Sequence, residues 1–150
     1  MRGLLIKACK FDWSGISPAI FGALFQSVMD KQQRREQGAH YTTEQNILKV
    51  IEPLFLRDLR AEFERLKARK DSRRRVELEA FHKQLATLTF FDPACGCGNF
   101  LIIAYRELRL LEMEVIRILR SYRSDEKQLE LDAAALSLVD VDQFYGIEIG

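Results

Sequence analysis

Apolar residues recur at helical spacing through much of the first 88 positions. An early helix is predicted to begin at Ser17-Pro18, where a capping residue precedes a proline suited to the first helical turn. Its buried face would carry Ile20, Phe21, Leu24, Phe25, Val28 and Met29. A polar run and Gly38 then end the pattern. The first part of the chain is therefore expected to be helical.

A second helical period runs from Glu44 to Leu66 and is interrupted near Pro53, because proline cannot continue a regular helix. Thr42 followed by Gln45 fits a capping box, so we expect Thr42 to cap this helix. A highly charged stretch, residues 67–75, separates it from a third helix that ends near position 88. We interpret the basic residues of that stretch as solvated surface.

The pattern changes at residues 89–91, a short aromatic run typical of a strand. It ends at Asp92-Pro93, passes two alternate glycines, and leads into a long helix predicted over residues 100–122. The far face of that helix carries Arg106, Glu107, Arg109, Glu112, Glu114 and Arg117. We therefore expect the helix to be covered on one side only.

A second strand is predicted over residues 143–149, with Glu148 near its carboxyl end, whereas residues 131–141 give no clear pattern. In nucleotide sites built on parallel sheets, an acid after the next strand accepts the ribose hydroxyls. Glu148 follows Asp92 by 56 positions (148 minus 92), against about 20 in the usual spacing. A longer helix and connection can absorb that difference, since the entropy of loop closure grows only logarithmically.

Gly96 and Gly98 would bring bare backbone against a ligand, because they lack Cβ atoms and permit positive φ beside a helix start. Ile102 occupies the place of the third glycine of a dinucleotide fingerprint, and no Gly-Lys-Ser/Thr follows. Neither NAD nor ATP is favoured. A turn whose glycines serve geometry alone is the alternative.

Composition excludes several other classes. The net charge of +1 predicts no strong electrostatic field, and three cysteines with two histidines do not make a zinc set. We read Cys95 and Cys97 as small turn residues. No apolar run is long enough to cross a bilayer, and the first residues are too few for a signal peptide core. We expect a cytoplasmic protein without a membrane partner.

The run from Asp92 to Leu101, Asp-Pro-Ala-Cys-Gly-Cys-Gly-Asn-Phe-Leu, resembles the first cofactor motif of S-adenosylmethionine-dependent DNA methyltransferases, above all the adenine-specific ones. Residues 38–43 resemble their Gly-x-x-Tyr-Thr-Pro motif, with Thr43 in place of proline, and residues 144–149 resemble their ribose-binding motif. By this resemblance the cofactor-binding residues would be His40, Tyr41, Thr42, Asp92, Pro93, Ala94, Cys95, Gly96, Gly98, Asn99, Phe100 and Glu148.

The runs at residues 20–26, 35–42 and 100–108 are most similar to MmeI-like single-chain restriction-modification enzymes. The resemblance implies the α/β class: an incomplete Rossmann-like class I methyltransferase domain over residues 89–150, after a helical region over residues 1–88. It also implies double-stranded DNA as a partner of the full-length protein. The family's Asn/Asp-Pro-Pro-Tyr/Phe motif is absent. We therefore expect no catalytic residue here, and an amino-terminal, cofactor-binding part of a larger enzyme.

Two other functions stay open at this point. A methyltransferase that acts on RNA or protein would share the glycine turn. A non-catalytic helical interaction module would account for the helix-rich first 88 residues.

Overall fold

The computed structural model describes residues 9–10, 42–122 and 136–148. The chain divides into two compact units, Met1–Tyr41 and Thr42–Gly150, and every element below belongs to the second. The helix predicted at residue 17 and the site residues His40 and Tyr41 lie outside the described residues.

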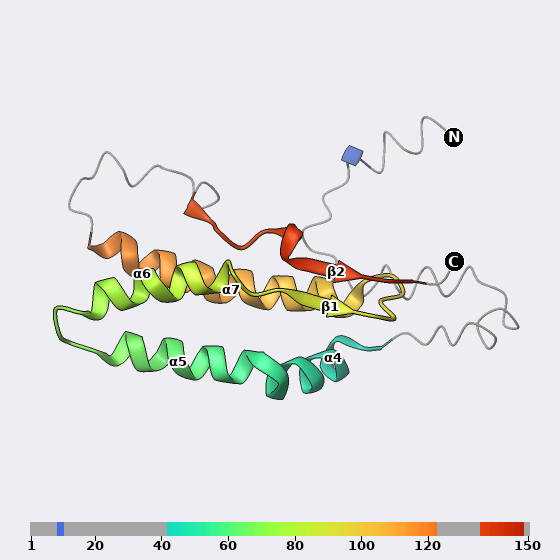
Figure 1. The fold of residues 1–150 in the computed structure, drawn as a ribbon, viewed down its shortest axis with the longest axis horizontal. Helices are drawn as coiled ribbons and strands as arrows, with labels where there is room; N and C mark the ends of the chain where they lie inside the picture. The colour runs from blue at the N-terminus through green and yellow to red at the C-terminus, as the bar shows by residue number, and fades with distance from the viewer. Residues whose placement is uncertain (1–8, 11–41, 123–135, 149–150) are drawn as a thin grey trace, which may run out of the picture. The chain divides into compact units, whose positions relative to one another are not determined.

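Helices make up most of the described part of the second unit, with one small sheet (Figure 1). The elements follow in the order α4 (Glu44–Ile51), η1 (Glu52–Leu56), α5 (Arg57–Ala68), α6 (Arg74–Leu85), β1 (Phe90–Asp92), α7 (Asn99–Ser121), η4 (Val141–Gln143) and β2 (Phe144–Gly146). The predicted order of helices, strand, long helix and second strand is confirmed. No helix in the described segments is long and apolar enough to cross a membrane.

Helix α4 begins one residue later than the capping pattern predicted. Thr43, not Thr42, is the N-cap: it is extended (φ −63°, ψ 151°), and its hydroxyl accepts from the Asn46 N–H at 3.4 Å. The Thr43 carbonyl accepts from the N–H groups of Asn46 and Ile47 at 2.9 and 3.0 Å. The expected cap at Thr42 was wrong because the neighbouring threonine offers both the side-chain and the main-chain acceptor.

The predicted break at Pro53 is a wide helical turn. Element η1 is a π-helix with Pro53 in its first turn, and the Arg57 N–H bonds to the Glu52 carbonyl five residues back. A π turn holds one residue more than an α turn, so the buried positions step from Ile51 to Leu56. Leu54, three positions after Ile51, would lie on the buried face of a regular helix, but it is 72% exposed for the same reason.

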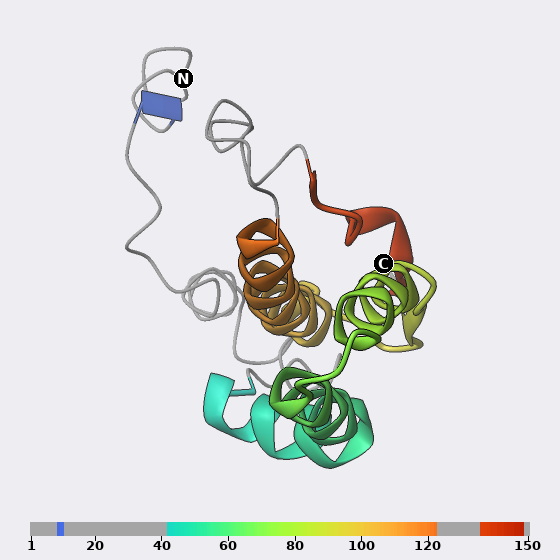
Figure 2. The ribbon, with the colours of Figure 1, turned by 90° about the vertical axis from the view of Figure 1, so that its left-hand side faces the viewer.

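Helices α5, α6 and α7 run alongside one another and enclose the larger apolar cluster (Figures 1 and 2). Its buried members are Phe63, Leu66, Leu78, Phe81, Leu85, Leu108, Leu111, Val115 and Val139. A smaller cluster joins α4 and η1 to the start of α7 through Ile47, Ile51, Leu56 and Ile103. Because burial of apolar area is the main favourable contribution to folding, these two clusters fix α7 between the earlier helices.

The expectation that α7 would keep one solvated face holds for Glu114 and Arg117, which are exposed, but it was wrong for two of the acidic residues. Glu107 and Glu112, assigned to its solvated face, are 7% and 0% exposed. Arg60 of α5 reaches Glu107 at 2.9 Å, and Arg106 pairs with both Glu107 and Glu44 at 2.7 Å. Residues 137–139 cover Glu112. The helical period cannot distinguish a solvated carboxylate from one that donors on other segments will enclose.

Glu112 accepts hydrogen bonds from three parts of the fold. The Leu138 and Val139 N–H groups donate to Oε1 at 2.6 and 3.0 Å, and the Ser137 hydroxyl and Arg109 donate to Oε2 at 2.7 Å. His82 of α6 approaches Oε1 at 2.9 Å, and its Nε2 carries the hydrogen because a carboxylate only accepts. Burial alone would raise the pKa of Glu112, but these donors outweigh it and lower the pKa to about 2.

This depressed pKa predicts how stability depends on pH. The pKa of Glu112 falls from 4.5 to about 2 on folding, so its contribution of about 3 kcal/mol is complete above pH 4.5 and is lost as the pH falls toward 2. Urea titration measures the unfolding free energy at each pH. Between pH 4.5 and pH 2 we expect it to fall in both proteins, and the fall should be about 3 kcal/mol smaller in Glu112→Gln than in the wild type. Glu114→Gln, an exposed residue of the same helix, is the control and should follow the wild type. Equal falls in Glu112→Gln and the wild type would contradict this assignment.

Candidate functional site

The candidate site is built on the parallel pairing of β1 with β2. Phe90, Phe91 and Asp92 pair with Phe144, Tyr145 and Gly146 respectively. Parallel strands end at the same edge of a sheet, so the turn after Asp92 and the residues after Gly146 lie together. Main-chain bonds continue the pairing past the strands: the Ile147 N–H donates to the Asp92 carbonyl, and the Cys95 N–H donates to the Ile147 carbonyl, both at 3.0 Å.

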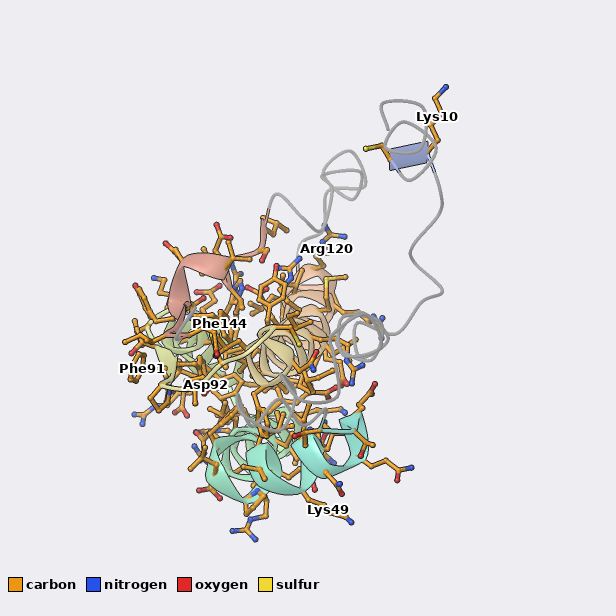
Figure 3. The ribbon with its side chains drawn as sticks, turned by 90° about the vertical axis from the view of Figure 1, so that its right-hand side faces the viewer. Lys10, Lys49, Phe91, Asp92, Arg120 and Phe144 are labelled. Atoms are coloured by element: carbon orange, nitrogen blue, oxygen red, sulfur yellow. The ribbon has the colours of Figure 1, made fainter. Side chains whose placement is uncertain are left out.

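Aromatic side chains hold one face of this small sheet. The register partners Phe90 and Phe144 stack with ring centroids 5.0 Å apart. Phe55 of η1 and Tyr105 of α7 add further ring contacts at 4.7 and 5.5 Å. Phe91, on the other face, is 61% exposed and points outward in Figure 3, whereas Phe144 lies inside. The sheet is thus anchored to the helices through one face.

The turn between β1 and α7 has the backbone conformation that the two glycines predicted. Gly96 has φ +55° and Gly98 has φ +81°, in the left-handed region that side chains disfavour. Gly98 caps α7, and its carbonyl accepts the Ile102 N–H at 2.9 Å. A Cβ at Gly96 would have no atom within 4 Å, and one at Gly98 would reach only Ile102, at 4.0 Å. The main chain of the turn therefore faces open space.

Glu148 and the glycine turn meet directly, although 52 positions separate them. The Gly96 N–H donates to Oε2 of Glu148 at 2.7 Å. Asp92, at the end of β1, accepts the Ala94 N–H on Oδ1 at 3.0 Å. The main chain of the turn is therefore directed toward carboxylate oxygens at one edge of the sheet, and both predicted acids lie at that edge.

A hollow of about 470 Å³ opens beside this turn. Four of the predicted site residues line it, Asp92, Pro93, Ala94 and Phe100, and its other walls are largely apolar, including Val50, Ile51 and Leu54. Glu148 is not among the lining residues, and it contacts the turn through the Gly96 N–H instead. The turn thus has a carboxylate and a largely apolar hollow next to it.

The remaining predicted residues occupy supporting positions. Asn99, the first residue of α7, is 9% exposed, and Phe100 packs against the smaller apolar cluster around Ile47. Thr42 is half-buried just before the cap of α4. Cys95 is half-buried in the turn, and Cys97, which is not one of the predicted site residues, is exposed. Among the described residues no group of three or more histidine, cysteine or acidic side chains is placed to hold a metal ion.

Gly146 is a functional position that the sequence analysis missed. A Cβ there would lie 2.6 Å from Sγ and 2.9 Å from Cβ of Cys95, and 3.2 Å from Cδ1 of Leu101. The glycine in the run Tyr145-Gly146-Ile147 was the available signal, because glycine inside a strand often marks a close approach of another segment. It allows β2 to lie against the turn that contains Cys95.

Comparison with known proteins gives consistent relatives. The family described as "MmeI, DNA-methyltransferase domain" matches residues 66–150. DNA methyltransferase A of Bacillus subtilis (strain 168) is 43% identical over 149 residues, which are 99% of this chain and 16% of that protein. A solved structure of the type IIL restriction-modification enzyme MmeI in complex with DNA is 58% identical, with a TM-score of 0.81 over 99% of this chain and 19% of its own. The chain thus spans less than a fifth of either relative.

The tight fit at Gly146 predicts a coupled loss of stability. We expect Gly146→Ala to lower the unfolding free energy by about 1–3 kcal/mol, because the new methyl group overlaps Cys95. Cys95→Gly removes both overlapping atoms, so the same alanine should cost less in that background. Urea unfolding of the two single variants and the double variant measures the coupling. The same alanine cost in both backgrounds would contradict the contact.

Proposed function

Because this chain belongs to the MmeI DNA-methyltransferase domain family, we propose that it is the S-adenosylmethionine-binding part of an enzyme that methylates the amino group of adenine in DNA. The observation that carries this proposal is the meeting of the Gly96 N–H with the Glu148 carboxylate at 2.7 Å. An acid that follows the second strand thus lies beside the bare backbone that follows the first strand.

The residues at the turn fit such a cofactor. Gly96 leaves open space where a side chain would lie, so a ligand can approach the main chain closely. Oxygen Oδ1 of Asp92 is used by the Ala94 N–H, which leaves Oδ2 to accept a hydrogen bond from the cofactor's amino group. This division of the carboxylate supports the cofactor-binding role that the resemblance implies for Asp92.

Glu148 fits the recognition of ribose hydroxyls. A carboxylate has about four lone-pair positions, and the Gly96 N–H uses one of them. Oε1 and the remaining position on Oε2 can accept the two hydroxyls without loss of that bond. Glu148 would therefore orient the sugar while its bond to the turn keeps the carboxylate in place.

His40, Tyr41 and Thr42 are proposed to close over the methionine end of the cofactor. They directly precede α4, whose cap is Thr43. The N-terminal N–H groups of a helix favour a carboxylate, and the methionine end carries one. Pro93, Ala94, Cys95, Gly98, Asn99 and Phe100 would shape the turn and the hollow beside it.

S-adenosylmethionine supplies an electrophilic methyl group on a positively charged sulfur. The residues described here bind and orient the cofactor, which is the positioning contribution to catalysis. The rest of the enzyme would complete the Rossmann-like domain that we assign to residues 89–150, after the helical region 1–88. It would also bind double-stranded DNA and hold the extruded adenine. A cytoplasmic location follows from this role.

Removing the Glu148 carboxylate tests the proposal. We expect Glu148→Ala in the full-length protein to weaken S-adenosylmethionine binding roughly 10-fold or more, because hydrogen bonds to a charged group contribute about 1.5–3 kcal/mol each. Isothermal titration calorimetry measures the affinity. Asp142→Ala is the matched control, since Asp142 is an exposed acid of the same segment, six positions earlier. Asp92→Ala is less clean, because it also removes the bond to Ala94.

The control variant should bind as the wild type does. A folded Glu148→Ala protein with unchanged affinity would refute the ribose role. A wild-type protein that does not bind S-adenosylmethionine would refute the proposed function itself.

A further inference from the structure

The segment that leads into β2, residues 137–143, is held at both ends by buried side chains. At its start, the N–H groups of Leu138 and Val139 and the hydroxyl of Ser137 all donate to Glu112 of α7. Val139 is itself buried in the larger apolar cluster. This lead-in segment therefore enters the strand from a fixed point on the helix.

Gln143 fixes the other end of the lead-in segment. Its Nε2 donates to the carbonyls of Leu85 and Leu88 at 2.9 and 2.7 Å, and its Oε1 accepts the Asp140 N–H at 2.9 Å. Leu85 is the last residue of α6, and Leu88 lies between α6 and β1. The segment is thus attached to α7 at one end and to the connection before β1 at the other.

Such attachment matters because the strand pairing is short. Three residue pairs, continued by two main-chain bonds at Ile147, define the register of β1 with β2. A slip of one residue turns every side chain of a strand to the opposite face. Glu148 follows Gly146 by two positions, so a slip would take its carboxylate away from the Gly96 N–H. The point at which the lead-in segment leaves α7 limits which register β2 can adopt.

We infer that Glu112 is a positioning residue for Glu148: by holding the start of the lead-in segment, it sets the register in which the carboxylate reaches the glycine turn. This inference rests on the proposed function, in which Glu148 binds the ribose. Glu112 is fully buried in α7, 36 positions before Glu148 (148 minus 112), and acts through the lead-in segment and β2.

A carboxylate suits this task better than an apolar side chain would. Well-packed hydrophobic residues often replace buried charges without loss of stability, and buried polar groups are retained in some proteins because they select one arrangement. Glu112 has donors from α6, from its own helix and from the lead-in segment. The donors from the lead-in segment can reach Glu112 only when residues 137–139 lie against α7 as they do in this structure.

The test compares two ligands that differ at the sugar, S-adenosylhomocysteine and its 2′-deoxy analogue, by calorimetry on the full-length protein. We expect the wild type to prefer the hydroxylated ligand by roughly 10-fold, the size of a hydrogen bond to a charged group. Glu112→Gln places an amide NH₂ group among hydrogen-bond donors, which weakens the attachment of the lead-in segment to α7. The preference for the hydroxylated ligand should therefore fall below about 3-fold. Glu114→Gln, two positions away on the exposed face, should keep the wild-type preference.

Each outcome decides a separate point. A wild type that binds neither ligand refutes the proposed function, whereas one that binds both equally refutes ribose recognition and with it this inference. A folded Glu112→Gln protein with the wild-type preference overturns this inference alone. A general loss of stability would weaken both ligands alike and leave their ratio unchanged. If Glu112→Gln does not fold, Ser137→Ala removes a single donor, and an unchanged preference in that variant overturns the inference.

Discussion

Parallel pairing of β1 with β2 is the constraint on which the candidate site depends. Two parallel strands cannot be joined by a tight hairpin, so the chain must cross from the end of one to the start of the next. Helix α7 makes up a large part of that crossover, and the glycine turn leads directly into it. Both strands end at one edge of the sheet, so the crossover brings together two residues that are 52 positions apart. The Gly96 N–H and Oε2 of Glu148 lie 2.7 Å from each other.

The crossover also explains why α7 contains buried carboxylates. A helix placed between α4, α5, α6 and the returning chain is covered over much of its middle, and a stripe that includes Leu110, Met113 and Glu114 is left to solvent. Glu107 and Glu112 are nevertheless enclosed, and each is matched by donors on a neighbouring segment. Arg60 of α5 reaches Glu107, beside Arg106 of α7 itself, and His82 with residues 137–139 reaches Glu112. Ion pairs replace apolar contacts at these two points, and they fix how the segments sit along the helix axis.

Local features of this chain were predictable from its sequence, and long-range ones were not. The strand before Asp92, the positive φ of Gly96 and Gly98, and the long helix after them depend on residues that are close in sequence. The burial of Glu112 depends on hydrogen-bond donors about 26 positions later. The spacing of apolar residues along a helix cannot predict such a contact. The cap moved from Thr42 to Thr43 because two adjacent threonines offer equivalent side chains. A glycine within a predicted strand suggests that another segment approaches closely, so the role of Gly146 was open to prediction. The sequence could not show that Cys95 is the residue that approaches it.

The wide turn η1 has a consequence for how this part of the chain can change over evolution. A π turn differs from an α turn by one inserted residue. Deletion of Pro53 would turn this π turn into an α turn, and the helices on either side of it would keep their present faces. Deletion of a residue within α4 or α5 has no wide turn to absorb it and would rotate one side of the helix by about 100 degrees against the other. Ile47 and Ile51 could then no longer face Ile103 while Phe63 and Leu66 kept their own partners. The wide turn is therefore the place where this part of the chain can lose one residue without loss of its packing.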